Sequence, residues 1–201
     1  MVAGRDILED LAGGDPIPHL SDDRSEVRRL AVAACSRLGL DALEPLSELS
    51  AHDPDEEVRA EAIEVLGLLG EAASAAALAA RADSSLRVVE AATTALGEIG
   101  DPTTVPWLIE TSTNHEAALV REAAIAALGS IGDERSLPTL LEAVRTGKPQ
   151  IRRRAVVALT AFEGPEVEAA LTTARLDRNP MVREVAEMVL GREISGGAPP
   201  E

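Results

Sequence analysis

The sequence predicts an all-α solenoid built from six similar pairs of helices. Three observations predict this fold class. A short motif of a branched apolar residue followed by arginine recurs every 30 to 32 residues, apolar residues after it follow the period of an α-helix, and glycine ends most copies at a fixed distance. A repeat of this length forms one helical hairpin, and hairpins that stack on one another bury a continuous apolar core.

The recurring motif marks the second helix of each pair. We number repeat positions from its branched residue, which is position 0, and position 1 is arginine in five of the six copies. The second helices are therefore predicted to start near residues 27, 58, 88, 120, 151 and 182, at Val27, Val58, Val88, Val120, Ile151 and Val182.

Positions 0, 4, 8 and 11 lie on one stripe of such a helix and are predicted to face the core. Position 4 is alanine in all six copies, and position 8 is leucine in five copies and Cys35 in the first. A larger side chain at position 4 would overpack by about 1–3 kcal/mol, so we expect neighbouring helices to approach most closely there.

Turn residues predict where the helices end and begin. A glycine suits the left-handed conformation that commonly closes a helix, and several of the shorter first helices carry proline near their start, where it costs no hydrogen bond. The predicted closing glycines are Gly39, Gly70, Gly100 and Gly132, with Gly164 in the fifth copy, and the prolines are Pro45, Pro106 and Pro138.

The link between the two helices of a pair carries an acidic position. Position −5 is aspartate in four copies (Asp22, Asp53, Asp83 and Asp177) and is His115 or Thr146 in the others. We expect this residue to cap the incoming helix, and we expect the arginine at position 1 to bind the link of a neighbouring repeat, which would form a ladder along the stack. The third copy has Val89 in place of the arginine.

One repeat domain is expected over residues 1–193. Within it, residues 1–20 are predicted to form an N-terminal cap on the first layer, because the end of a solenoid needs a polar outer face. Residues 194–201, ISGGAPPE, are predicted to be a disordered tail.

These residues resemble HEAT repeats, in particular the short bacterial kind called phycobilisome-lyase HEAT-like repeats, over about residues 16–191. The copy that begins at Ala117 fits the pattern D-x4-V-R-x2-A-x2-A-L-G-x-I-G best. The resemblance implies a right-handed superhelix whose second helices line a concave face where partners dock. Positions 2, 6 and 9 are expected there, and the candidate partner-binding residues are Arg29, Glu64, Glu90, Thr94, Glu122, Arg153, Val157 and Met188.

Trp107 is a further candidate for partner binding. It lies between Pro106 and the first core leucine of its helix, on a chain that has one Trp, one Phe and no Tyr. An exposed tryptophan would serve as an interface anchor, and packing against a neighbouring repeat is the equally supported alternative.

Charge and cysteine content limit the function classes. The formal charge is −16, and residues 1–100 hold 8 basic and 20 acidic residues against 11 and 15 in residues 101–201. Such a field disfavours nucleic acid and anionic lipid and favours a basic partner. A single cysteine excludes an intramolecular disulfide and points to a reducing compartment, so we expect a cytoplasmic protein with no membrane segment or signal peptide. One lysine among 19 basic residues, with abundant alanine, suggests a GC-rich bacterial genome.

The predicted function is a non-catalytic scaffold or adaptor, such as an assembly factor or accessory subunit, that binds another protein. No cofactor or metal is expected, and the chain is expected to be monomeric on its own. Cys35 is predicted to be a buried, inert thiol, because it replaces a core leucine.

Two alternatives remain open. His115–Glu116 resembles the His-Glu pairs with which a HEAT-like hydroxylase holds two irons, which would imply a metal-dependent or lyase-like enzyme. That family uses four pairs, whereas this chain adds only His52–Asp53, so a capping role for His115 is favoured.

The segment RTGKPQIRRR offers a basic patch for phosphate, RNA or an acidic protein through Arg145, Lys148, Arg153 and Arg154, with Arg152 reserved for the ladder.

Overall fold

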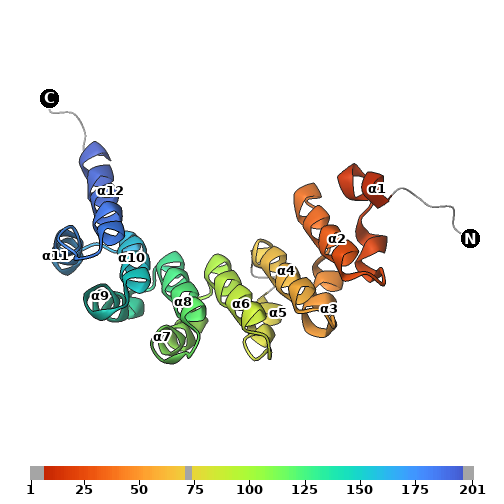
Figure 1. The fold of residues 1–201 in the computed structure, drawn as a ribbon, viewed down its shortest axis with the longest axis horizontal. Helices are drawn as coiled ribbons and strands as arrows, with labels where there is room; N and C mark the ends of the chain where they lie inside the picture. The colour runs from red at the N-terminus through yellow and green to blue at the C-terminus, as the bar shows by residue number, and fades with distance from the viewer. Residues whose placement is uncertain (1–6, 71–73, 197–201) are drawn as a thin grey trace, which may run out of the picture. The chain divides into compact units, whose positions relative to one another are not determined.

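The chain forms an α-solenoid of helical hairpins (Figure 1). The computed structural model describes residues 7–70 and 74–196, and within these ranges all regular structure is helical. The α-helices are α1 (Ile7–Gly13), α2 (Ser25–Leu38), α3 (Leu43–His52), α4 (Glu56–Gly67), α5 (Ser74–Ala80), α6 (Leu86–Ile99), α7 (Val105–Asn114), α8 (Ala118–Ile131), α9 (Leu137–Thr146), α10 (Pro149–Ala158), α11 (Pro165–Ala174) and α12 (Pro180–Gly196). Short 3-10 turns are η1 (Ile17–Ser21), η3 (Pro102–Thr104), η4 (Glu134–Ser136) and η5 (Leu159–Ala161).

The helices group into two compact units, one that ends at Ile99 and one that begins at Gly100. We call these the N-terminal unit and the C-terminal unit. The boundary follows the copy in which Val89, a buried residue, replaces the ladder arginine. A single domain over residues 1–193 remains a prediction.

The prediction for the closing glycines is confirmed in part, because the C-cap of α4 is Leu68 instead of Gly70, and Gly164 is the N-cap of α11 instead of the end of α10. Gly39 and Gly132 are the C-caps of α2 and α8, with φ of 62° and 66°, and Gly70 and Gly100 also adopt positive φ. A side chain at these positions would strain the backbone, so glycine is favoured. Pro106 and Pro138 lie in the first turns of α7 and α9.

The core follows the predicted stripe at positions 0, 4 and 8. All six alanines of position 4 are fully buried, as are the leucines of position 8 in the second to fifth copies. Position 11 departs from the prediction in the second copy, where Leu69 is 39% exposed. The reason is that α4 already ends at Gly67, so Leu69 lies in a turn instead of on the buried face.

Position 9 is a place of close approach between neighbouring second helices, and the expected approach at position 4, where all six alanines are fully buried, stays a prediction. A Cβ built on Gly129 would lie 2.6 Å from the Cα of Ala158 in α10. A Cβ on Gly67 would likewise lie 2.9 Å from the Cβ of Ala95 in α6. These glycines let the helices pack backbone against side chain.

The predicted ladder is present. Arg28 donates Nε and Nη2 to the carboxylate of Asp53 at 2.7 and 2.8 Å, and Nη1 donates to the carbonyl of Asp22 in its own link at 2.8 Å. Arg59 binds Asp83 and the carbonyl of Asp53 in the same way, and Arg152 binds Asp177. Each arginine therefore connects its own link with the next one.

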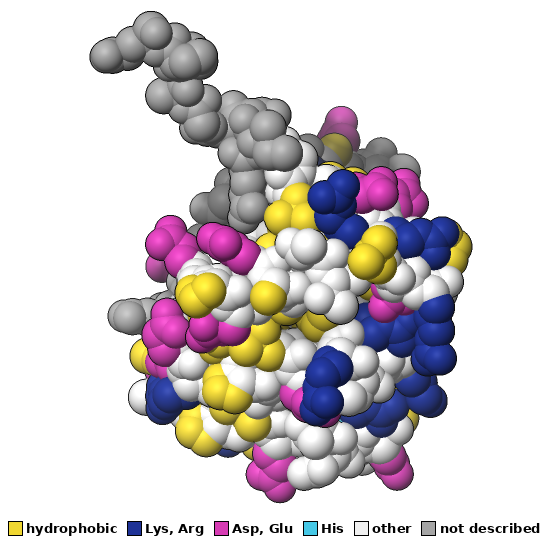
Figure 2. Space-filling model, turned by 90° about the vertical axis from the view of Figure 1, so that its left-hand side faces the viewer, with side chains coloured by type: hydrophobic (Ala, Val, Ile, Leu, Met, Phe, Trp, Pro, Cys, Tyr) yellow, Lys and Arg dark blue, Asp and Glu magenta, His cyan; other side chains and the backbone are white. Residues whose placement is uncertain are grey.

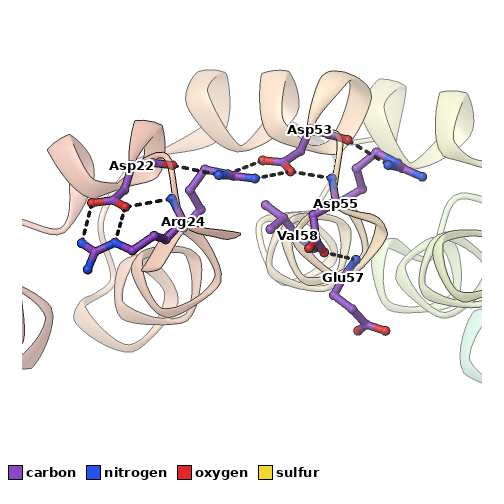
Figure 3. Close-up of polar contacts among 8 residues, drawn as sticks. Asp22, Arg24, Asp53, Asp55, Glu57 and Val58 are labelled. Carbon is purple, nitrogen blue, oxygen red and sulfur yellow. Dashed lines mark hydrogen bonds and ion pairs between the residues drawn. The ribbon is translucent and has the colours of Figure 1, made fainter. Parts of the chain in front are cut away.

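The aspartates of position −5 cap the link, and a different residue caps the helix. Asp53 accepts from the backbone N–H of Asp55 at 2.9 Å, and Asp22 accepts from the N–H of Arg24 at 3.0 Å (Figure 3). The N-cap of α4 is Asp55, whose side chain accepts from the N–H groups of Glu57 and Val58. Both oxygens of Asp53 therefore accept from Arg28, and its Oδ1 also accepts from the N–H of the turn.

The two ends differ from the repeats. At the N-terminus, α1 and η1 pack against α2, and Asp10 of α1 lies 3.1 Å from Nε2 of His19 in η1. At the C-terminus, α12 continues to Gly196, three residues into the predicted tail, and residues 197–201 lie outside the described part of the chain. No helix in the described ranges is long and apolar enough to cross a membrane.

Candidate protein-docking surface

Grooves with volumes of about 370 to 490 Å³ lie beside several helices. The groove most relevant to the predicted docking face crosses the second helices of the N-terminal unit. This groove, of about 370 Å³, runs over α2, α4 and α6, and we call it the second-helix groove. Its lining consists of Ala33, Ser36, Glu61, Glu64, Val65, Leu68, Thr94, Ala95 and Glu98.

The second-helix groove has an apolar floor and an acidic rim. Leu68 is 68% exposed, and Glu61, Glu64 and Glu98 supply three carboxylates. Glu64 accepts from Nη2 of Arg87 at 2.5 Å, whereas burial and the nearby charge of Glu64 raise the pKa of Glu98. Burial is the larger of these two causes, and a cation brought by a partner would stabilise the charged form of Glu98.

The predicted docking residues divide between this groove and other surfaces. Glu64 and Thr94, both at position 6, line the groove, while Arg29 is exposed and lies 3.9 Å from Glu61. Glu90 is half-buried. In the C-terminal unit, Glu122 and Arg153 are half-buried, and Val157 and Met188 are about half exposed, at 51% and 52%.

The expected stripe of positions 2, 6 and 9 is wrong in part. Ala60 at position 2 and Gly67, Gly97 and Gly129 at position 9 are buried, so they cannot line an open face. The groove is lined mostly from positions 3, 6, 7 and 10, and position 9 contributes only Ser36 of the first copy. Positions 3, 6, 7 and 10 follow helical spacing, and the absence of a Cβ at position 9 in three copies was the signal that this side faces a neighbouring helix.

Trp107 is half-buried and packs against the core of the C-terminal unit. The core it contacts is formed by buried residues of α7 to α12, among them Leu108 and Leu140. This placement favours the packing interpretation of Trp107.

The basic segment is spread over a link and the start of α10. Arg145 and Arg154 are exposed, and so is Lys148, while Arg145 donates to Glu142 of its own helix. Arg152 is buried in the ladder, as predicted. Lys and Arg side chains gather along one edge of the face shown in Figure 2, and hydrophobic side chains lie nearer its centre.

The histidines and the cysteine that were considered as metal ligands or nucleophiles lie in a link turn, in the core or on the exposed surface. Nδ1 of His115 accepts from the N–H of Ala117 at 3.2 Å, so His115 caps the turn of its link and not helix α8. His52 and Glu116 are exposed. Cys35 is buried, and burial raises the pKa of its thiol, which keeps it protonated at neutral pH. Among the described residues, no group of three or more His, Cys, Asp or Glu is placed to hold a metal ion.

A family model described as HEAT repeats matches residues 16–94, 81–160 and 106–191. The chain belongs to the HEAT-repeat family. Its resemblance to HEAT repeats, read from the positions above, is thereby confirmed. No curated protein matches the chain.

Solved HEAT-like and armadillo structures share this fold. A chain of the complex of CpcE and CpcF of phycocyanin lyase from Nostoc sp. PCC7120 is 22% identical, with a TM-score of 0.62, over 74% of this chain and 98% of that one. A designed armadillo repeat protein in complex with the peptide (KR)4 is 17% identical, with a TM-score of 0.60, over 88% and 97%. An engineered protein is 18% identical, with a TM-score of 0.58, over 96% and 100%. At these identities the likeness establishes the fold alone.

Proposed function

We propose that this HEAT-repeat protein is a non-catalytic scaffold or adaptor that docks a segment of another protein in the second-helix groove. The observation that carries the proposal is the groove itself, an open channel across α2, α4 and α6 with small side chains on its floor. Small floor residues let a helix or an extended segment lie close to the surface. The lining offers no nucleophile paired with a base.

The acidic rim indicates the kind of partner. Glu61, Glu64 and Glu98 face the groove, and residues 1–100 carry 20 acidic residues against 8 basic ones. A basic segment would be attracted by this field and would relieve the repulsion between Glu64 and Glu98. The designed armadillo protein that has a similar fold was solved with the basic peptide (KR)4, which is compatible with this use of the architecture.

Affinity capture with the full chain tests the proposal. The tagged chain would be incubated in lysate, and proteins retained in stoichiometric amounts would be identified by mass spectrometry. Thr94→Arg places a long cation on the floor of the groove and is expected to abolish capture. Thr172→Arg makes the same change at an exposed position of α11, outside the groove, and is expected to leave capture intact.

Two outcomes would contradict the proposal. One is the absence of any stoichiometric partner across salt and growth conditions. The other is equal loss of a partner in Thr94→Arg and Thr172→Arg, which would mean that the partner does not use the groove.

The alternative functions remain testable in their own right. A metal-dependent or lyase-like activity requires iron or zinc at about one equivalent in the purified protein, lost on His115→Ala. Binding of nucleic acid through Arg145, Lys148, Arg153 and Arg154 requires a salt-dependent anisotropy signal with duplex DNA or RNA. No observation in the described part of the chain favours either alternative over the scaffold.

A further inference from the structure

One arginine of the ladder lacks its aspartate. Nη1 of Arg121 donates to the carbonyls of His115 and Glu116, just as Nη1 of Arg59 donates to the carbonyl of its own link. The next link, however, has Thr146 where other copies have aspartate. Among the described residues, neither Nε nor Nη2 of Arg121, the two donors that we call its fork, has a hydrogen-bond or ion-pair partner.

Arg121 lines a cavity of about 490 Å³ between α7 and α9, which we call the Arg121 cavity. Its lining consists of Ser112, Thr113, Arg121, Ile125, Pro138, Thr139, Glu142, Ala143, Thr146, Gly147, Lys148 and Ile151. All of these residues belong to the C-terminal unit.

Two comparable grooves show what the Arg121 cavity lacks. The groove between α3 and α5, of about 480 Å³, is lined by Asp83, which binds Arg59. The groove between α9 and α11, of about 590 Å³, is lined by Asp177, which binds Arg152. In both grooves the chain supplies the carboxylate itself, whereas in the Arg121 cavity it supplies a threonine.

The charges in the Arg121 cavity favour an anion. Arg121 and Lys148 line it as cations, and Lys148 is exposed. Glu142 also lines it, but this carboxylate accepts from Nε of Arg145 at 3.1 Å and from its Nη2. The hydroxyl of Thr146 donates to the carbonyl of Glu142 at 3.1 Å and so is bound to α9.

We infer that the Arg121 cavity binds a side-chain carboxylate from an acidic segment of a partner protein, which completes the ladder. The chain itself demonstrates the fit, because the three intact pairs hold Asp53, Asp83 and Asp177 with N···O distances between 2.7 and 3.0 Å. Such a two-pronged contact is among the strongest polar contacts available to arginine, and Lys148 adds a second positive charge beside it. The site is separate from the second-helix groove and does not depend on it.

Fluorescence anisotropy with the full chain tests the inference. The probe is a labelled peptide of alternating Asp and Gly, acetylated and amidated at its ends so that only side-chain carboxylates are offered, and the matched probe has Asn in place of Asp. The Asp probe is expected to bind. Arg121→Gln is expected to weaken binding about tenfold or more, since a charge-assisted contact is lost.

Matched controls separate a site from general charge. Arg175→Gln removes one exposed positive charge outside the cavity and outside the basic patch, and is expected to change the affinity less than about twofold. Equal weakening by Arg121→Gln and Arg175→Gln, or equal binding of the Asn probe, would overturn the inference. Displacement of the Asp probe by inorganic phosphate at a similar concentration would also overturn it, because the cavity would then be a phosphate site.

Thr146→Asp provides a second test that does not remove Arg121. It places a carboxylate where Asp83 and Asp177 stand in the other links, so it is expected to raise the melting temperature and to abolish binding of the Asp probe. Thr146→Asn has nearly the same shape without the charge and is expected to keep the binding. A Thr146→Asp protein that binds the probe as the unchanged protein does would contradict the inference.

Discussion

The ladder arginine is a residue that holds two repeats at once. Arg152 donates Nη1 to the carbonyl of Gly147 in its own link at 2.7 Å, while Nε and Nη2 donate to the carboxylate of Asp177 in the next. Its side chain is 4% exposed. A buried guanidinium is tolerated only when its donors are satisfied, so the pair fixes how neighbouring links are placed.

Asp177→Asn is therefore expected to destabilise the protein by about 3 kcal/mol, because it leaves the charge of Arg152 buried without a counterion. Glu142→Gln is the matched control, since it removes a carboxylate that pairs with the exposed Arg145. Because solvent screens an exposed pair, the control is expected to change the stability little. Urea unfolding of both variants measures the difference, and equal effects would mean that the buried pair is not special.

The same carboxylates predict a loss of stability in acid. Hydrogen bonds from Arg152 lower the pKa of Asp177, and at Asp83 those from Arg59 and the N–H of Ser85 outweigh burial, which acts to raise the pKa. Arg135 likewise lowers the pKa of Asp133 to about 2. A carboxyl with a lowered pKa binds fewer protons in the folded state, so its contribution is complete above the unfolded value and is lost below it.

We expect the free energy of unfolding to fall as the pH drops from about 4 toward about 2, the interval between an ordinary aspartate pKa and that of Asp133. Urea unfolding at a series of pH values measures the slope. In Asp177→Asn the slope should be smaller, because one of the contributing carboxyls is gone. A free energy that rises on acidification through this interval would contradict the assignment.

At the scale of the helix, glycine at position 9 controls how closely two second helices pack. Gly129→Ala would place a Cβ 2.6 Å from both Cα and Cβ of Ala158, so α8 and α10 would have to separate. We expect a loss of about 1–3 kcal/mol, although alanine favours a helix by about 1 kcal/mol.

Gly191→Ala is the matched change at the same repeat position, where a Cβ would have no atom of the described residues within 4 Å. Here the higher helix propensity of alanine acts alone, and a gain of about 0.5–1 kcal/mol is expected. Thermal unfolding of the two variants checks the opposite signs. If both variants are stabilised, the helices do not depend on the close approach at position 9.

Most of the helices could be predicted, because their signals are local and recur. Position 0, position 4 and the closing glycines each repeat at the same spacing, and the ladder follows from an Arg and an Asp that recur together. The burial of position 9 could not be predicted from spacing alone, since glycine contributes no side chain to a hydrophobic stripe. Likewise, the choice between Asp53 and Asp55 as helix cap depends on the path of the link, to which both residues contribute.

The lining of the second-helix groove was predicted less well than the fold. Glu64 and Thr94 line the second-helix groove as predicted. The predicted positions 2 and 9, however, are each one residue away from positions 3 and 10, which line the groove. The Arg121 cavity was not predicted from the sequence, because it arises where one copy departs from the repeat pattern. An aspartate replaced by Thr146 looks like drift until the structure shows that the partner arginine is still held in place.

At the scale of the whole molecule, repulsion among the excess acidic side chains opposes the stabilisation by the Arg–Asp pairs that hold the links together. Of the formal charge of −16, residues 1–100 contribute 8 − 20 = −12 and residues 101–201 contribute 11 − 15 = −4. Repulsion among exposed charges extends over about 8 Å at physiological ionic strength and is screened by salt, whereas buried pairs such as Arg28–Asp53 are screened much less.

Added salt is therefore expected to stabilise the full chain. Thermal unfolding between about 0.02 and about 0.3 M sodium chloride should show a rising melting temperature, because repulsion is weakened more than the ladder is. Changing the exposed Glu44 and Glu48 of α3 to lysine alters the charge from −16 to −12, so this variant should melt higher at low salt and respond less to added salt. A melting temperature that falls as salt is added would mean that exposed ion pairs, and not the excess of acid, dominate the electrostatics.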